Sequence, residues 1–323
     1  MRTLIGVGEQ EDGVYIFQSP ASAKVCRVSV EGNYYLWHRR LGHASNKIIS
    51  LLPGVSKMEC QKFRDEPCDI CFKAKQTRNV FPISMNKAND MFALVHCDVW
   101  GAYRIPSSCG THYFISIVDD YSRGVWVYLM AHKSEVAQLF KNFCAMAKTQ
   151  FNRQVKMVRS DNGTEFKVLN SFFAENGIEF QASCVDTPQQ NGRVERKHRH
   201  LLNVGRALRF QANLPLNFWG ECILSAAYII NRTPTPLLGG KTPYELLHGK
   251  PPPYAHFCSF GCLCYARYVP RDKNKFNPRS RQCVFVGYPH GKKCWRVFDL
   301  ETNEFFVSRD VVFFQDTFLY HDI

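Results

Sequence analysis

The sequence lacks any apolar run of about 18 or more residues, the length at which a membrane-spanning helix becomes a candidate. Its opening residues, MRTLIGVGEQ, also lack the apolar region of a secretory signal peptide. Both absences argue against a protein that is inserted into or carried across a membrane. We therefore expect a soluble, intracellular protein without a membrane partner.

Acidic residues are few relative to basic ones. The chain of 323 residues has 28 Asp and Glu against 41 Lys and Arg, which gives a formal net charge of +13. This excess favours a polyanionic partner, and nucleic acid is the obvious one, although charge does not determine the fold. The length allows two or three domains with a substantial core.

Cysteine is abundant, with 14 residues, but the spacing is irregular. In an intracellular protein we expect these thiols to be reduced or bound to metal, not joined in disulfides. The most regular part combines H-x4-H with C-x2-C, and 24 residues lie between the two pairs. The four residues of this set are His38, His43, Cys68 and Cys71.

Two imidazoles and two thiolates form the closed tetrahedral set that structural Zn²⁺ prefers. Residues 33–80 have little else to bury, so a bound ion would supply much of their folding free energy. We therefore predict one structural Zn²⁺ in this region. The alternative is a pair of packed histidines with two free thiols, and Cys60 is a competing ligand.

Two carboxylates stand out between Ser160 and His200. Asp161 follows the β-branched run 155–158 and precedes Asn162 and Gly163, which predicts a strand that ends in a turn. Glu195 lies near the start of a predicted helix, with one mixed face and one apolar face. The mixed face has Glu195, Arg199, Leu202 and Arg206, and the apolar face has Val194, Leu201, Val204 and Leu208.

Asp98 is the third acidic residue of interest. It lies in the apolar run FALVHCDVW, residues 92–100, which predicts a carboxylate inside a buried strand. Burial of such a group costs free energy unless it is paired or ligates a metal. Mg²⁺ takes oxygen ligands, and two such ions need several carboxylates. We therefore expect Asp98, Asp161 and Glu195 to act together, although each alone is more often an ordinary surface charge.

Four segments, HCDVWGAY, FISIVDDYSRGVWVYLM, VRSDNGTEF and TPQQNGRVERKHRHLL, are similar to segments of the integrase of copia-type retrotransposons. That enzyme belongs to the retroviral-integrase superfamily, and the resemblance covers nearly the whole chain. It implies an α/β fold with an RNase H-like catalytic core and a D,D,E triad at Asp98, Asp161 and Glu195. It also implies an HHCC zinc-binding helical module and a C-terminal SH3-like small β-barrel.

The activity implied by the resemblance is that of a polynucleotidyl transferase. Such an integrase processes the 3′ ends of double-stranded element DNA and joins them to target DNA. Its cofactors would be two catalytic Mg²⁺ or Mn²⁺ ions at the triad and one structural Zn²⁺. It would work as a homo-oligomer, in a cytoplasmic virus-like particle and then in the nucleus. Residues that would hold the DNA are Gln190, Asn191, Arg193, Arg196, Lys197, Arg199 and Arg206.

The chain departs from the family pattern in two places. There are 33 residues between Asp161 and Glu195, two fewer than usual, and the difference falls near Lys167 to Ser171. Thr164 stands where Gly is common. A loop at 167–171 that absorbs the shorter spacing would keep Glu195 in register.

We predict four segments along the chain: a pre-integrase leader at 1–32, the HHCC module at 33–80, the core with a helical extension at 91–250, and the SH3-like domain at 255–323. In the leader we expect strands at 13–17 and 24–30. In the core we expect strands at 92–100, 112–119, 124–130, 155–160 and 178–183. Expected helices are 134–150, with Ser134 as N-cap, 170–176, the one bearing Glu195, 216–230 and 242–248.

Residues 255–323 are dense in aromatic residues, Val and Cys, and predict strands at 257–269, 282–288, 293–300 and 303–314. From Arg267 to Arg296 nine basic residues face a single acid, Asp272, for a net +8. This balance favours a grip on DNA phosphates, while a protein–protein module is the alternative. We interpret the cysteines here as small buried residues and not as a second metal site. They are Cys258, Cys262, Cys264, Cys283 and Cys294.

Two other functions fit parts of the sequence. An RNase H-like nuclease would share the core but needs no HHCC module. A non-catalytic DNA-binding or assembly protein, decayed or co-opted by its host, would share the fold, and an intact triad argues against it. Asp119 and Asp120 faintly resemble a reverse-transcriptase signature, but Ile117 replaces the expected aromatic residue, so we interpret the pair as hairpin-turn residues.

Overall fold

The computed structural model describes residues 7–11, 14–18, 34–52, 68–75, 87–161, 163–183, 191–267, 276 and 278–321. At the N-terminal end, β1 (Val7–Glu11) and β2 (Val14–Gln18) form an antiparallel hairpin. The strand predicted at 13–17 corresponds to β2. The sequence VGEQE of β1 has no apolar alternation, so this strand was not predicted, and the strand predicted at 24–30 lies outside the described residues.

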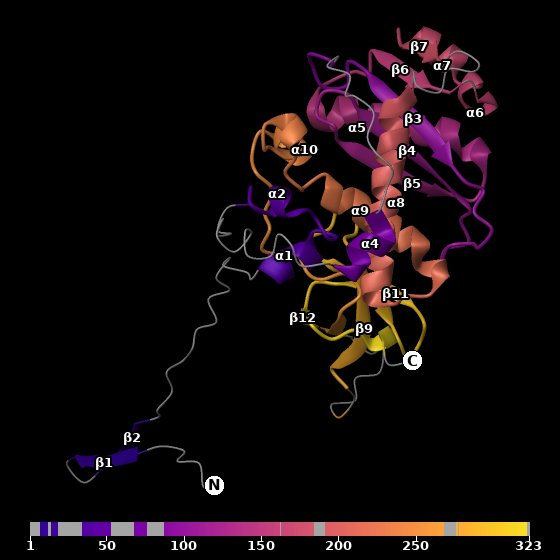
Figure 1. Cartoon of the computed structure of the whole chain (residues 1–323). Coiled ribbons are helices and arrows are strands. Elements are labelled where there is room, and N and C mark those ends of the chain that lie inside the picture. Colours follow the sequence, from indigo (N-terminus) through magenta and orange to yellow (C-terminus); the bar gives the residue numbers. More distant parts are fainter. Residues whose placement is uncertain are drawn as a thin grey trace.

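A five-stranded mixed sheet forms the centre of the molecule, in the order β5-β4-β3-β6-β7 (Figure 1). Strands β3, β4 and β5 are antiparallel neighbours, whereas β6 and β7 continue the sheet parallel to β3. All five predicted core strands are present. Their bounds are Val95–Trp100, Tyr113–Asp119, Val125–Met130, Met157–Ser160 and Glu179–Ala182.

Three helices lie between these strands in the chain, namely α5 (Val136–Phe151), α6 (Thr164–Lys167) and α7 (Asn170–Glu175). The apolar side of α5 packs into a fully buried cluster with Phe92, Ile115 and Val158 of the sheet region. Ser134 is not an N-cap, contrary to prediction. It lies inside a 3-10 turn, η1 (Lys133–Glu135), where the Glu135 carboxylate accepts from the backbone N–H of His132.

Two long helices carry the rest of the core: α8 (Gly192–Ala212) and α9 (Trp219–Ile230), with a 3-10 turn, η3 (Leu216–Phe218), between them. The apolar face predicted for α8 is confirmed, because Val194, Leu201, Val204 and Leu208 are all buried. After the 3-10 turn η4 (Pro236–Leu238), α10 (Pro243–His248) starts at Thr242, whose hydroxyl caps the Glu245 amide.

The N-terminal module consists of α1 (Tyr34–Arg40), α2 (Asn46–Ile49) and α4 (Asp69–Lys75). In Figure 1, α4 lies against α8, and α1 and α2 lie beside the α8–α9 hairpin. Tyr34, Trp37 and Leu41 of this module are almost fully buried in a core shared with both long helices. The module therefore folds onto the domain with the central sheet as part of the same core.

The C-terminal sheet has the order β11-β10-β9-β8-β12, with antiparallel neighbours. The predicted strand at 303–314 is in fact two strands separated by a turn at 309–310. The bounds are Leu263–Arg267, Ser280–Gly287, Trp295–Asp299, Phe305–Ser308 and Val311–Phe314 for β8 to β12, and a 3-10 turn, η5 (Leu319–His321), follows.

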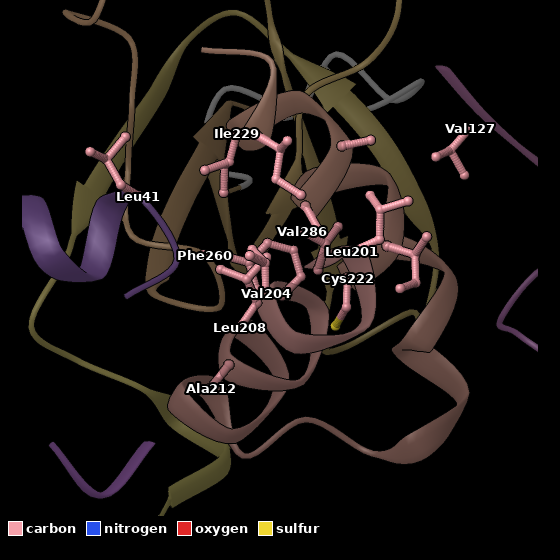
Figure 2. Close-up of a cluster of buried hydrophobic side chains, with 14 of the residues drawn as sticks. Leu41, Val127, Leu201, Val204, Leu208, Ala212, Cys222, Ile229, Phe260 and Val286 are labelled. Atoms are coloured by element: carbon pink, nitrogen blue, oxygen red, sulfur yellow. The ribbon is translucent and has the colours of Figure 1, made fainter. Parts of the chain in front are cut away.

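One hydrophobic core joins the three parts of the protein. Figure 2 shows Leu41 of the N-terminal module, side chains of α8 and α9, and Phe260 and Val286 of the C-terminal sheet region within one cluster. Gly261, at φ +82°, marks the closest approach, since a Cβ built there would lie 2.0 Å from the Cβ of Ala212 on α8. The proline run Pro251–Pro253 thus separates two sheets that share a core.

Four of the C-terminal cysteines behave as predicted. Cys258, Cys262, Cys264 and Cys283 are buried in a cluster with Phe285 and Val297, and burial raises the pKa of Cys283 to about 11. Among the described residues they form no group suited to a metal ion. None of the described helices has the length and apolar character needed to span a bilayer.

Candidate metal centres

The end of α1 brings His38 and His43 together. The N–H of His43 donates to the carbonyl of His38 at 2.6 Å, and the N–H of Gly42 donates to that of Arg39 at 3.1 Å. This is the Schellman arrangement that terminates helices. Gly42 has φ +61°, and a Cβ there would lie 2.7 Å from Val204 Cγ1, so glycine suits both the turn and the contact with α8. The four residues between His38 and His43 thus form the end of α1 and the turn that terminates it.

The thiols of Cys68 and Cys71 complete the group from the start of α4. Cys68 Sγ lies 3.4 Å from His43 Nδ1, and Cys71 Sγ lies 3.4 Å from His38 Nε2. All four ligand atoms lie within 4.8 Å of one another. Ideal tetrahedral Zn²⁺ with Zn–N and Zn–S bonds of normal length places N and S about 3.6 Å apart, so the group fits this ion.

The protonation of the two histidines also suits a metal, whereas the Cys71 thiol must lose its proton to ligate one. Burial lowers the pKa of His38 to about 4 and that of His43 to about 3, so both rings are neutral at physiological pH and offer a lone pair. Burial raises the pKa of Cys71 to about 11. Lys75 donates from Nζ to the carbonyls of Gly42 and His43, which places a positive charge beside the thiols.

The three carboxylates come from three elements. Asp98 lies in β3, Asp161 directly follows β6, and Glu195 lies in the first turn of α8. Because β3 and β6 are parallel neighbours, both aspartates lie toward the same end of their strands in the sheet. The 167–171 stretch with the shorter spacing runs from the end of α6 to the start of α7.

The charges of the other two carboxylates affect the pKa of Asp98. Burial, followed by the charges of Asp161, Glu195 and Glu165, raises the pKa of Asp98 to about 7, while its own neighbouring Val99 amide opposes the rise. Within the described residues, the zinc-type group is the one set of donors gathered tightly enough for an ion. The three carboxylates are not gathered as tightly as the zinc-type group.

His198 holds Asp98 in place and was not predicted as a site residue. Its Nδ1 lies 3.2 Å from Asp98 Oδ2, and its Nε2 lies 2.5 Å from Ser116 Oγ, the residue opposite Asp98 in the β3–β4 ladder. Burial lowers the pKa of His198 to about 4, so the neutral ring can donate to Asp98 and accept from Ser116. The available signal was helical spacing, since His198 lies one turn beyond Glu195.

A change at Asp98 tests this electrostatic description. The pKa rises from 3.8 to about 7 on folding, so between these pH values the folded protein binds a proton that the unfolded chain releases, and stability falls as pH rises. Asp98→Asn should therefore raise the Tm of zinc-loaded, magnesium-free protein at pH 8, and raise it less at pH 6. Each pKa unit is worth about 1.4 kcal/mol, so a gain of a few kcal/mol is expected.

Thermal melts at both pH values, with and without magnesium, would check this. Magnesium should raise the Tm of the wild type at pH 8 and should have little effect on the variant. A variant that melts below the wild type at pH 8 would contradict the conclusion that the ionised Asp98 carboxylate destabilises the folded protein.

Several residues predicted to hold DNA make contacts inside the protein. Arg193 pairs with Asp120, which also accepts from His96 and Arg123. Asn191 is buried and donates to the Cys97 carbonyl at 3.3 Å, next to Asp98. Lys197 donates to the Arg123 carbonyl. The exposed members of the predicted set are Arg196, Arg199 and Arg206, whereas Gln190, like Asn162 of the turn, lies outside the described residues.

These internal contacts fix the first turn of α8 against β3 and the β4–β5 turn. Asp119 is the last residue of β4 and Asp120 begins that turn, close to the predicted position of the pair, and both are buried. Asp119 accepts from the Phe92 and Ser122 backbone amides. Glu195 therefore projects from a helix start that is anchored on both sides.

Glu165 is a further acidic residue that sequence reasoning missed. It lies at the start of α6 and forms an ion pair with Lys133 at 3.1 Å, with only 8% of its side chain exposed. Its charge contributes to the raised pKa of Asp98. The sequence feature that could have identified Glu165 is its position two residues after Gly163, in the segment that follows Asp161.

Three family profiles match the chain in sequence order. The GAG-pre-integrase domain matches residues 13–76, the integrase core domain matches 88–188, and the retroviral polymerase SH3-like domain matches 262–322. The first includes all four zinc-type ligands. The second includes Asp98 and Asp161, while Glu195 lies just beyond its end. The RNase H-like core, the HHCC module and the SH3-like domain predicted from the sequence are thus confirmed as the fold.

The chain is also similar to three curated plant proteins. They are the retrovirus-related Pol polyproteins from transposon TNT 1-94 of Nicotiana tabacum (34% identity, 92% of this chain and 22% of that protein), RE1 of Arabidopsis thaliana (33%, 94% and 20%) and RE2 of the same plant (31%, 95% and 21%). The chain spans about a fifth of the length of each.

Among solved structures, a chain of the simian T-cell lymphotropic virus intasome in complex with PP2A regulatory subunit B56 gamma matches with a TM-score of 0.42 and 16% identity, covering 84% of this chain and 94% of that one. The profiles and the plant relatives agree on one assignment. The chain carries an integrase core domain and is homologous to the integrase region of retrovirus-related Pol polyproteins from plant transposons, as its copia-type motifs predicted.

Proposed function

We propose that the chain is a retrotransposon integrase, a polynucleotidyl transferase that processes the 3′ ends of element DNA and joins them to target DNA. The observation that supports the proposal is the arrangement of Asp98, Asp161 and Glu195, three carboxylates from separate elements of an integrase core. Asp98 and Asp161 lie toward the same end of parallel neighbouring strands, and the charges of Asp161 and Glu195 both act on Asp98. Burial first, and then the charges of these two neighbours, raise the pKa of Asp98, and a carboxyl perturbed in this way is typical of a functional site.

The three side chains fit hard divalent cations. They offer only oxygen, and Asp161 and Glu195 are exposed while Asp98 is 20% exposed, so ions with their water ligands can reach them. We propose two Mg²⁺ or Mn²⁺ ions at this site. Such ions, when bound, activate water or a DNA 3′-hydroxyl and offset charge on the leaving oxygen.

The protein's own groups orient this site. His198 fixes the direction of the Asp98 carboxylate, and Arg193 with Asp120 fixes the helix turn that bears Glu195. Arg196, Arg199 and Arg206 lie exposed along α8 beyond Glu195, where guanidinium groups can contact phosphates. We propose double-stranded DNA as the partner of this surface. We also propose a homo-oligomer as the working state, because both ends of the element must be joined to the same target DNA.

The decisive test is a strand-transfer assay with the element's own DNA ends, Mg²⁺ and a plasmid target. Joined products are expected. Cleavage of the ends without joining would indicate an RNase H-like nuclease, and DNA binding without either product would indicate a decayed or co-opted binding protein.

The C-terminal domain allows a second test, of its proposed grip on DNA. Among its described basic residues, Arg267, Arg281 and Arg296 lie near the acids Asp310, Asp299 and Glu221, so the net charge that DNA meets is smaller than the sequence count. Among the basic residues that the structure describes in this domain, Arg279, Lys292 and Lys293 are exposed and form no ion pair.

Replacement of Arg279, Lys292 and Lys293 by Ala should flatten the dependence of DNA affinity on salt. Each lost phosphate contact should reduce the log–log slope by about 0.9 on duplex DNA. Salt titrations of the full chain and the triple variant measure this. Deletion of 255–323 would be a poor control, because it exposes the shared core, whereas replacement of Arg267, Arg281 or Arg296 would disturb ion pairs. Equal slopes would favour a protein–protein role for the domain.

A further inference from the structure

Gln211 occupies a junction between the three parts of the protein. It lies in the last turn of α8 and is buried, with 5% exposure. Its Oε1 lies 2.8 Å from His43 Nε2 in the zinc-type group, and its Nε2 lies 3.3 Å from the carbonyl oxygen of Phe260 at the edge of the C-terminal domain. One amide thus connects residues 43 and 260.

The chemistry of these neighbours determines the direction of both hydrogen bonds. A backbone carbonyl can only accept, so the NH₂ of Gln211 must face Phe260 and its oxygen must face His43. That oxygen can only accept as well, so a His43 ring that ligates a metal must carry its one proton on Nε2. His43 Nδ1 is then left with a lone pair, and it is the atom that lies 3.4 Å from Cys68 Sγ.

The ring of His38 is oriented in the same way, but by an acceptor that is close to it in the sequence. His38 Nδ1 lies 2.8 Å from the Ala44 carbonyl, so its proton is held there and Nε2 faces Cys71. For His38 the acceptor comes from the same turn of chain. For His43 it comes from α8, and the orientation of that acceptor comes from the C-terminal domain.

We infer that Gln211 is a positioning residue that sets the metal-binding tautomer of His43 and couples zinc binding to the docking of the C-terminal domain. This inference rests on the proposed zinc occupancy of the HHCC group. A partner that orients the other nitrogen of a metal-ligating histidine typically changes metal affinity by about 10- to 100-fold. Because coupling between two binding equilibria is reciprocal, zinc should also tighten the docking.

Two substitutions separate the two hydrogen bonds. Gln211→Met keeps the side-chain volume and removes both, so zinc affinity should fall about 10- to 100-fold. Gln211→Glu keeps an acceptor for His43 but cannot donate to Phe260. It should retain wild-type zinc affinity or exceed it, while amide exchange at residues 257–267 becomes faster.

Zinc affinity would be measured on the full chain by competition with a chromophoric chelator, and the folding of each variant by thermal melts in excess zinc. Ser225→Ala is the matched control, since Ser225 Oγ donates from α9 to the Val286 carbonyl at 3.4 Å and touches no zinc-type ligand. It should leave zinc affinity unchanged.

The tautomer can also be read in the wild-type protein without any variant, from the ¹⁵N shifts of the His43 ring in the zinc-loaded chain. A ligating Nδ1 and a protonated Nε2 are expected. Ligation through Nε2, or a Gln211→Met variant that binds zinc within twofold of the wild type, would overturn the inference. A wild-type chain that binds no zinc would instead refute the zinc site itself.

Discussion

Glu195→Gln is expected to abolish both 3′-end processing and strand transfer while DNA affinity stays close to that of the wild type. The substitution removes a negative charge from the proposed ion site without a change of shape. Bound ions contribute several kcal/mol to charge stabilisation in the transition state. Since each 1.4 kcal/mol is a factor of ten, the loss should be on the order of a thousandfold or more.

Strand-transfer rates and DNA binding would be measured side by side for this variant and for Glu175→Gln. Glu175 ends α7 and is exposed, so its replacement makes the same chemical change away from the carboxylate group. Glu175→Gln should be fully active. If Glu195→Gln retained comparable activity, the third carboxylate would have to be sought elsewhere.

Removal of zinc should have the second large effect. Cys68→Ser, or a chelator, removes a ligand set that in small zinc domains supplies about 10–16 kcal/mol of folding free energy. The module is also part of the shared core, because Trp37 and Leu41 pack with Val204 and Leu208 of α8. We therefore expect a fall in Tm on the order of 10 °C or more, and faster amide exchange at 34–52 and in the second half of α8.

The central sheet should remain protected, since the cluster of Phe92, Ile115 and Val158 lies on α5 and contains no residue of the module. Cys109→Ser is the control, because Cys109 is exposed and its thiol contacts Ser108 and Arg296, not the four ligands. Addition of zinc after chelation should restore the Tm. Unchanged zinc content and heat stability in Cys68→Ser would remove the site.

The elements that the sequence predicted well are those with a strong local pattern. The apolar runs of β3, β4 and β5 and the period of α5 and α8 needed no knowledge of distant residues. Errors arose where local patterns were weak or interrupted. The polar strand β1 was missed, and the break at 309–310 was not predicted. Ser134 was predicted to be the N-cap of a helix, but it lies inside the 3-10 turn η1.

The site was predictable in its residue types but not in its supports. Asn191, Arg193 and Lys197 were predicted to hold DNA, as the resemblance to copia-type integrases implied. Their partners are Cys97, Asp120 and Arg123, some 70 to 95 residues away, and only tertiary structure brings them together. The same holds for the basic segment, whose acids Glu221, Asp299 and Asp310 lie outside the counted stretch.

The shared core has a consequence for how such chains can recombine. Related elements could exchange whole domains freely if each folded alone. Here Gly42 lies against Val204, and Gly261 lies against Ala212, at distances that leave no room for a side chain. A graft of a foreign N-terminal module or C-terminal sheet onto this α8 would have to bring glycine to both positions, or a compensating change in the helix. It is simpler for the three parts to be inherited as one block. A new combination of parts would have to fit the surface of α8.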